Sequence, residues 1–280
     1  MSRVSREKKI WVLSWMEAKM HFRSQRMIAL IGLLFLFICL GSWGLSDPSS
    51  KLTSELQYET PYEILFLVSL FVLFSATLGV VLLGFDGISR KRLTGELSIE
   101  LSQPIDRFDL ARSQLQGLWL AVFIPTTVFC IIGTFLIEQQ MGELPTLYDW
   151  LYFIIPTGLI IFWYACIQLL ASSVAKDLGS SVTLGIGVWM LFTFVWLLFT
   201  AILATLMGVD VTNLESNQYN RFSEIIDLLS PNGVYQLLLE GNLKPDDRPI
   251  ISQSYIWVST ILWSIIPGML FLRRFRGLRP

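Results

Sequence analysis

Long apolar runs alternate along the chain with shorter stretches that hold nearly all of its charged residues. A helix needs about 20 apolar residues to cross the hydrocarbon layer of a membrane, and six of the intervals between charged residues are that long. The pattern predicts an all-α membrane protein with six transmembrane helices, which together form a transmembrane domain over residues 27–272. The predicted spans cover about 27–46, 64–85, 113–137, 150–175, 181–209 and 252–272.

The fifth interval, between Asp177 and Asp210, is longer than one crossing requires. Either this span is tilted in the membrane, or its first residues, 179–181, form a turn before the helix.

Residues 1–26 precede the first span, and 7–25 have the pattern of an amphipathic helix that lies in the membrane interface. Apolar residues such as Trp11 and Trp15 gather on one arc, whereas Ser14, Glu17 and His21 form a narrow polar strip. Lys19 and Arg23 fall within the apolar arc, so their side chains would have to reach toward lipid headgroups. The alternative is a cytosolic extension of the first transmembrane helix.

Basic residues predict the orientation, because Lys and Arg next to a span resist translocation. Most of them lie before the first span, in the loop 86–112, at Lys176 and in the tail 273–280. These segments all fall on one side of a six-span protein. The bases expected on the other side are Lys51, Arg221, Lys244 and Arg248. Both termini are therefore expected in the cytoplasm, with the chain in the plasma membrane as a multi-pass protein.

The cytoplasmic loop 86–112 carries charges of both signs and a leucine stripe. Arg90, Lys91 and Arg92 meet Glu96 and Glu100 at helical spacings. Leu93, Leu97 and Leu101 repeat on one face, and Pro104 ends the pattern. We therefore expect one short amphipathic helix across the cytoplasmic face. A merely solvated loop helix is the alternative, although a leucine stripe needs a surface against which to be buried.

The external loop 210–251 is predicted to hold two amphipathic helices. Apolar residues in the first follow a helical period from Phe222 to Leu229. Ser230 and Pro231 are typical of the N-cap and first position of a second helix, which would end at Gly241. The two helices either lie over a translocation path or pack against neighbouring spans without a gating role.

Composition narrows the chemistry that the chain can perform. Hydrophobic residues make up 53% of the chain and charged residues only 15%, below the roughly 25% of a soluble domain. His21 is the only histidine, which argues against haem, copper or di-iron redox sites. Cys39, Cys130 and Cys166 lie inside apolar runs and predict neither a disulfide framework nor a metal site. Nothing in the sequence indicates a nucleic-acid partner.

Energy for transport is expected to come from another subunit. The apolar intervals contain no ionisable residue, which disfavours an ion-coupled transporter or proton pump. No GxxxxGK[ST] phosphate-binding loop, GxSxG elbow or HExxH motif occurs. We therefore expect neither enzymatic activity nor a bound cofactor in this chain.

Three segments resemble the type 2 ABC transporter permease family, which includes the permease of the nitrous-oxide-reductase maturation transporter. The strongest match is FDGISRKRLTGELSIELSQPIDRFDLARSQL at 85–115, and weaker ones are LLSPNGVYQLL at 228–238 and EAKMHFRSQRM at 17–27. The residues that stand where the family pattern has them are Asp86, Gly95, Leu97, Leu101, Pro104 and Arg107. The basic triplet 90–92 departs from the acidic-basic-acidic turn of the family, so the surface complementary to an ATPase is expected to be more positive here.

The resemblance implies that 86–107 is the coupling helix, which docks into a groove of a cytoplasmic ABC ATPase. It assigns coupling to Asp86, Arg90, Lys91, Arg92, Gly95, Glu96, Leu97, Glu100, Leu101, Pro104 and Arg107. It also implies that the partner ATPase binds ATP and Mg and that a second permease copy, identical or related, completes an exporter. Membrane lipid surrounds the spans, and an external accessory protein is a further partner that the resemblance allows.

Two other functions are weighed against the exporter. One is a membrane scaffold or assembly factor that moves no substrate. The other is a membrane enzyme acting on lipid, for which Asp86, Asp106 and Asp109 are the candidate acids, although they sit among bases that explain them as a docking surface. Aromatic spans would tolerate an amphiphilic substrate, but the tryptophans concerned also suit packing or interfacial anchoring. These are Trp119, Trp163, Trp189 and Trp196.

Overall fold

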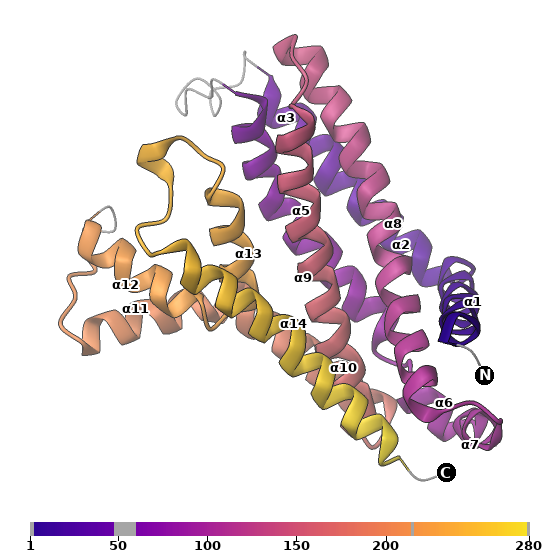
Figure 1. Cartoon of the computed structure of the whole chain (residues 1–280). Coiled ribbons are helices and arrows are strands. Elements are labelled where there is room, and N and C mark those ends of the chain that lie inside the picture. Colours follow the sequence, from indigo (N-terminus) through magenta and orange to yellow (C-terminus); the bar gives the residue numbers. More distant parts are fainter. Residues whose placement is uncertain (1–2, 48–59, 214–215, 279–280) are drawn as a thin grey trace.

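The computed structural model describes residues 3–47, 60–213 and 216–278, and every regular element in these ranges is a helix (Figure 1). Six helical segments are long and apolar enough to cross a membrane, judged by length and composition. The predicted all-α fold with six spans is therefore confirmed. Lys51 and Arg279, which entered the orientation argument, lie outside the described residues.

The helices of the six candidate spans begin and end within six residues of the predicted intervals, and their boundaries in a membrane stay a prediction. Two of the spans, the first and the fifth, contain a π-helical turn near the middle. The first span consists of α2 (Gln25–Leu34), η1 (Phe35–Cys39) and α3 (Leu40–Ser46), followed by α5 (Pro61–Gly84), α8 (Arg107–Met141) and α9 (Leu147–Val174). The fifth consists of α10 (Leu178–Met190), η2 (Leu191–Val195) and α11 (Trp196–Leu206), and the last is α14 (Gln253–Arg276).

Local capping explains where several spans begin. Thr60 and Glu63 form a capping box around Pro61, and Thr146 caps α9 in the same way. Asp177 caps α10 by accepting a hydrogen bond from the Ser180 N–H. Residues 179–181 therefore lie inside the helix, and the alternative that they form a turn is wrong.

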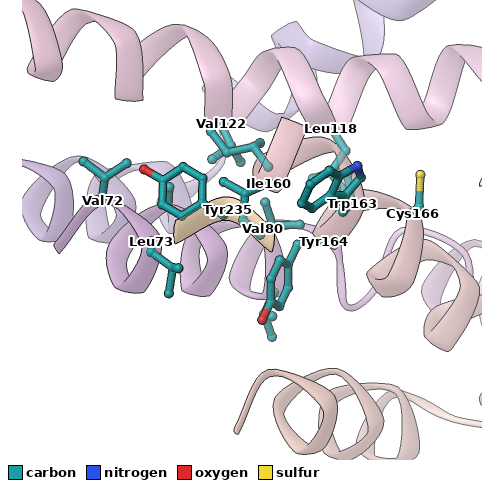
Figure 2. Packing of buried hydrophobic residues seen from close by; sticks show 14 of the residues in the cluster. Val72, Leu73, Val80, Leu118, Val122, Ile160, Trp163, Tyr164, Cys166 and Tyr235 are labelled. Atoms are coloured by element: carbon teal, nitrogen blue, oxygen red, sulfur yellow. The ribbon is translucent and has the colours of Figure 1, made fainter. Parts of the chain in front are cut away.

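The core of the bundle lies between α5, α8 and α9. Figure 2 shows large buried side chains of this core, among them Trp163, Tyr164 and Tyr235. Trp163 and Trp189 are buried, and their indole N–H groups donate to Ser264 (3.0 Å) and Thr77 (2.9 Å). These two tryptophans are packing residues rather than interfacial anchors, because each is enclosed and satisfied within the protein.

The N-terminal helix α1 (Arg3–Phe22) is separate from the first span, because the chain breaks at Ser24 before α2 begins. Figure 1 shows α1 nearly end-on beside α8, so it crosses that span instead of extending α2. The alternative of an extended first helix is therefore wrong. The polar strip faces the protein, where the Ser14 hydroxyl donates to Gln116 Oε1 at 2.9 Å, whereas Trp11 and Met16 are exposed. Its place in the membrane interface stays a prediction.

A glycine permits this crossing. A Cβ atom added at Gly117 of α8 would lie 2.5 Å from the Cβ of Glu17 and 3.0 Å from the carbonyl oxygen of Ser14. Only a residue without a side chain lets the two backbones approach this closely.

The external loop folds as the two predicted helices, α12 (Asn217–Asp227) and α13 (Pro231–Glu240), and Ser230 caps α13 as expected. A short 3-10 turn, η3 (Pro245–Asp247), follows. However, α13 is buried within the bundle: the Tyr164 hydroxyl donates to Asn232 Oδ1 at 2.7 Å. Tyr164 lies about 26 Å along α9 from Leu147, at a rise of 1.5 Å per residue. The hairpin of α12 and α13 therefore re-enters the bundle. Its packing against neighbouring helices agrees with the packing interpretation, whereas its depth was not predicted.

The loop after α5 contains two short helices, α6 (Ser89–Leu93) and α7 (Glu96–Ser102), so the expectation of one continuous helix is wrong. Gly95 separates them with a φ of 78°, a left-handed conformation that ends a helix and favours glycine. The break also disrupts the leucine stripe, because Leu97 is 1% exposed whereas Leu93 is 58% exposed.

Candidate coupling site

Residues 86–107, called the coupling element below, contain α6 and α7 and lie at the end of the bundle where α1 and the C-terminus are found (Figure 1). Three sets of polar contacts fasten the first part of this element, residues 86–92, to the rest of the chain. The first is made by Asp86, whose carboxylate receives two hydrogen bonds from the Arg26 guanidinium at 2.6 and 2.8 Å. This bidentate pair ties the end of α5 to the beginning of the first span.

Lys91 makes the second attachment. Its ammonium lies 3.1 Å from Glu17 Oε1 of α1 and 2.9 Å from Glu100 Oε1 of α7. The Lys91 side chain is only 12% exposed, and Glu100 also accepts a hydrogen bond from Gln114 of α8 at 3.1 Å. The cation therefore joins α6, α7 and α1, and its burial makes each of these contacts stronger than a surface ion pair.

Arg92 makes the third attachment, at the C-terminal end of α9. Its two terminal nitrogens donate to the carbonyl oxygens of Ser173 and Ala175, both at 2.9 Å. The last carbonyls of a helix have no partner within the helix, and a cation there also opposes the negative end of the helix dipole. Beside this contact, Ser172 Oγ accepts the N–H groups of Ile88 and Ser89, each at 3.1 Å. The beginning of α6 is thus held directly to α9.

The predicted coupling residues divide between an inner and an outer face. Those turned toward the chain are Asp86, Lys91, Arg92, Leu97, Glu100, Leu101 and Arg107. Those exposed to solvent are Arg90, Glu96 and Pro104, and Gly95 forms the turn. Of the basic triplet, only Arg90 is therefore exposed, so the expectation that all three bases make the docking surface more positive is wrong for Lys91 and Arg92.

The outer face also carries two apolar side chains. Leu93 is 58% exposed and Ile99 is 65% exposed. The sequence pattern placed Leu93 on the same apolar face as Leu97 and Leu101, whereas the structure exposes Leu93 and buries Leu97. Ile99 was not among the predicted coupling residues. The inner partners Glu17, Arg26 and Ser172 were missed too, because they lie far away in the sequence and no local pattern connects them.

The three acids considered for lipid chemistry are all paired. Asp86 binds Arg26, and the Arg6 guanidinium binds Asp109 at 2.6 Å and Asp106 at 3.2 Å. A carboxylate held by arginine is a poor general base, because the cation stabilises its ionised form. Within the described ranges, no group of three or more His, Cys, Asp or Glu residues is placed to hold a metal ion.

His21 lies close to these ion pairs and shares their environment. Burial lowers the pKa of His21; the positive charges of Lys91 and Arg26 act in the same direction, and Glu17 and Asp86 oppose them. A pKa below the ordinary value keeps the imidazole neutral at neutral pH. The His21 side chain therefore adds no positive charge to those of Lys91 and Arg26 where α1 meets the coupling element.

A hollow lies at the opposite end of the bundle, between α5, the α12–α13 hairpin and residues 244–250. Its volume is about 660 Å³, and acids outnumber bases among the residues that line it. The acids are Glu63, Glu224, Asp227, Glu240, Asp246 and Asp247, with Lys244 and Arg248 as the bases. Burial raises the pKa of Glu240 to about 7, and the nearby charges of Glu224 and Asp227 add to this effect. This hollow, called the acidic vestibule below, could not be recognised in the sequence, because α12 and α13 bring its residues together only by folding inward.

Most of the chain matches the model of a known protein family. A family model described as ABC-2 family transporter protein matches residues 11–277. The chain belongs to this family. It is a membrane permease of an ABC transporter, a component that has no ATPase site of its own and works with a cytoplasmic ABC ATPase. A search of curated proteins returns no match for the permease.

Proposed function

We propose that this permease forms half of the translocation path of an ATP-driven exporter and is driven through its coupling element by an ATPase that binds ATP and Mg. The observation that carries the proposal is the division of residues 86–107 into a fastened inner face and an exposed outer face. A segment that transmits force needs both a surface for the motor and a firm attachment to the moving part.

The outer face supplies the surface for the motor. Leu93 and Ile99 are apolar, more than half exposed and on neighbouring short helices, with Arg90 close by in the sequence. Apolar side chains exposed at an aqueous end of a membrane protein are typical of a contact surface, and a few such residues supply most of the binding energy of an interface. The polar residues around them, among them Glu96 and Ser98, would form its rim.

The inner face supplies the attachment. Arg92 and Ser172 connect α6 to α9, Asp86 connects it to the first span, and Lys91 connects it to α1. A push on the outer face would therefore reach the core helix α9 directly. The other spans would follow through their packing against it, because close-packed interiors transmit displacement.

Location and stoichiometry follow from the same proposal. Figure 1 shows the N-terminus, the C-terminus and the coupling element at one end of the bundle, which we assign to the cytoplasmic side of the plasma membrane. The fifth span is apolar but mostly exposed, which supports a second permease copy packed against this region. An external accessory protein would meet the opposite end.

The test is assembly of the permease with its partner ABC ATPase. Replacing both Leu93 and Ile99 by Asp should abolish co-purification of that ATPase and transport-linked hydrolysis, because the substitutions place charge in the contact. Leu144→Asp is the matched control, since Leu144 is 48% exposed in the short loop at the opposite end of the bundle. Normal assembly of the double variant would overturn the proposal. An ATPase that binds the permease but shows no substrate-dependent hydrolysis would support the scaffold alternative.

A further inference from the structure

A groove of about 450 Å³ runs between α8 and α9 on the part of the bundle that would lie in the membrane. Trp119 and Phe123 of α8 form one wall, and Ile155, Leu159 and Phe162 of α9 are among the residues of the other. The lining is almost entirely apolar. Its volume falls within the range of small-molecule sites, and its surroundings make a hydrocarbon chain the natural occupant.

The walls are fixed before anything binds. The Trp119 indole N–H donates to the Gly158 carbonyl oxygen at 2.9 Å, and its ring stacks on Phe123 with 4.8 Å between centroids. Gly158 allows this arrangement, because a Cβ there would lie 3.1 Å from the Phe123 ring. A groove whose side chains are already ordered loses little conformational entropy when it takes up a ligand.

One end of the groove is polar. Gln116 lines it there, and its Oε1 accepts the hydrogen bond from Ser14 of α1 at 2.9 Å. The Gln116 Nε2 donors make no hydrogen bond to any residue that the structure describes. The groove therefore places a hydrogen-bond donor at one end of an apolar trough, which is the arrangement that an amphiphile requires.

The helix at that polar end is basic. On α1 the acids Glu7 and Glu17 are paired with Arg112 and Lys91. Lys8 and Lys19 are exposed and lie about 9 and 8 Å along α1 from Ser14, at 1.5 Å per residue. A basic amphipathic helix in the interface attracts anionic lipid, and each Lys or Arg near the surface contributes about 1 kcal/mol to that attraction.

We propose that the groove holds one acyl chain of an anionic phospholipid, with an ester oxygen at Gln116 and the phosphate near the exposed bases Lys8 and Lys19 of α1 and Arg23 just after it. Charge complementarity selects the headgroup and the apolar walls select the chain. The lipid would fill the angle between α1, α8 and α9 and so stabilise the crossing of α1 beside the coupling element. The proposal concerns a lipid bound in place, and it does not depend on what the permease transports.

Native mass spectrometry of the purified full-length permease tests this, with dioleoyl phosphatidylglycerol and dioleoyl phosphatidylcholine as probes. We expect one retained phosphatidylglycerol, at least 10-fold more abundant than the phosphatidylcholine adduct. Ile155→Trp and Leu159→Trp should each reduce it about 10-fold by filling the groove. Ile261→Trp, at a similarly exposed position on α14, should leave it unchanged. Thermal unfolding of each variant without lipid checks its fold.

The headgroup is tested separately by the triple variant Lys8→Gln, Lys19→Gln and Arg23→Gln. This variant should bind both lipids equally while retaining the groove. Equal binding of the two lipids by the wild type, or full retention by both groove-filling variants, would overturn the proposal. Loss of ATPase assembly is the readout for the coupling proposal, so the two proposals can fail independently.

Discussion

Arg92 offers a way to separate attachment of the coupling element from docking of the ATPase. The substitution Arg92→Ala removes both hydrogen bonds to the end of α9 and leaves the exposed outer face unchanged. Hydrogen bonds from charged groups contribute about 1.5–3 kcal/mol each when buried. Arg92 is half-buried, and water can replace part of the loss, so we expect about 2 kcal/mol for the pair.

Losing these two hydrogen bonds shifts the equilibrium between α6 attached to α9 and α6 detached from it. About 2 kcal/mol corresponds to a roughly 30-fold change in that equilibrium. We therefore expect Arg92→Ala to bind the ATPase normally but to lose most substrate-stimulated hydrolysis and transport. Arg90→Ala is the matched control, because it removes the same side chain from the outer face of the same short helix. It should weaken ATPase binding modestly and leave the ratio of transport to hydrolysis unchanged.

The assay measures ATPase binding and transport in the same proteoliposomes, with both variants at matched density. The reasoning would be refuted if Arg92→Ala lost ATPase binding while Arg90→Ala did not. Equal coupling ratios in the two variants would refute it as well, because the contact with α9 would then carry no force. Arg92→Lys should recover part of the coupling, since one donor can still reach a carbonyl oxygen.

Three further perturbations follow from the contacts described above. Asp86→Asn should destabilise the permease by about 2 kcal/mol, because it leaves the Arg26 cation without its carboxylate. In thermal unfolding, the double variant with Asp86→Asn and Arg26→Gln should recover part of this loss, and additive effects of the two substitutions would contradict the pairing. Glu240→Gln should remove a pH dependence of the stability of the permease. The pKa of Glu240 is about 7 in the folded protein and 4.5 in the unfolded chain, so the wild type should lose up to about 3 kcal/mol of stability as the pH rises through this window. The melting temperature of the variant should not show this decrease. Gly117→Ala should destabilise the packing of α1 across α8 by about 1–3 kcal/mol. Gly187→Ala is the control and should be neutral or slightly stabilising, because a Cβ there meets no atom within 4 Å. Equal effects of the two substitutions on the protease resistance of the junction between α1 and α2 would contradict the close contact at Gly117.

The spans could be predicted from the sequence because their signal is local. A run of about 20 apolar residues between charges has few alternatives to crossing a membrane. Ser230 and Pro231 likewise specify the beginning of α13 through their own capping chemistry. In each case the residues that carry the signal are also the residues that form the element.

The coupling element could be located but not correctly described. The leucine period suggested one helix, yet the left-handed Gly95 breaks it, and glycine alone does not indicate which of its conformations it adopts. Lys91 and Arg92 looked like surface charges because the partners that bury them, Glu17 and the end of α9, lie more than 70 residues away in the sequence, and only the nearby partner Glu100 could be expected. Pairing across such distances depends on the packing of helices, which a single sequence does not specify.

The re-entry of α12 and α13 could not be predicted for a related reason. An amphipathic pattern shows that a helix has an apolar face but does not identify the surface that covers it. The hydrogen bond between Tyr164 and Asn232 reveals the depth of the hairpin, and both residues are unremarkable in the sequence. The acidic vestibule is a consequence of that depth.

The most direct test of the central claim is site-specific photocrosslinking from the coupling element. A photoreactive amino acid at Ile99 should crosslink to the partner ATPase, because that position is exposed on the outer face. The same group at Leu97, which is buried, or at Leu144, at the opposite end of the bundle, should not. Crosslinking from Leu144 with none from Ile99 would contradict the account, since the ATPase would then meet the other end of the permease.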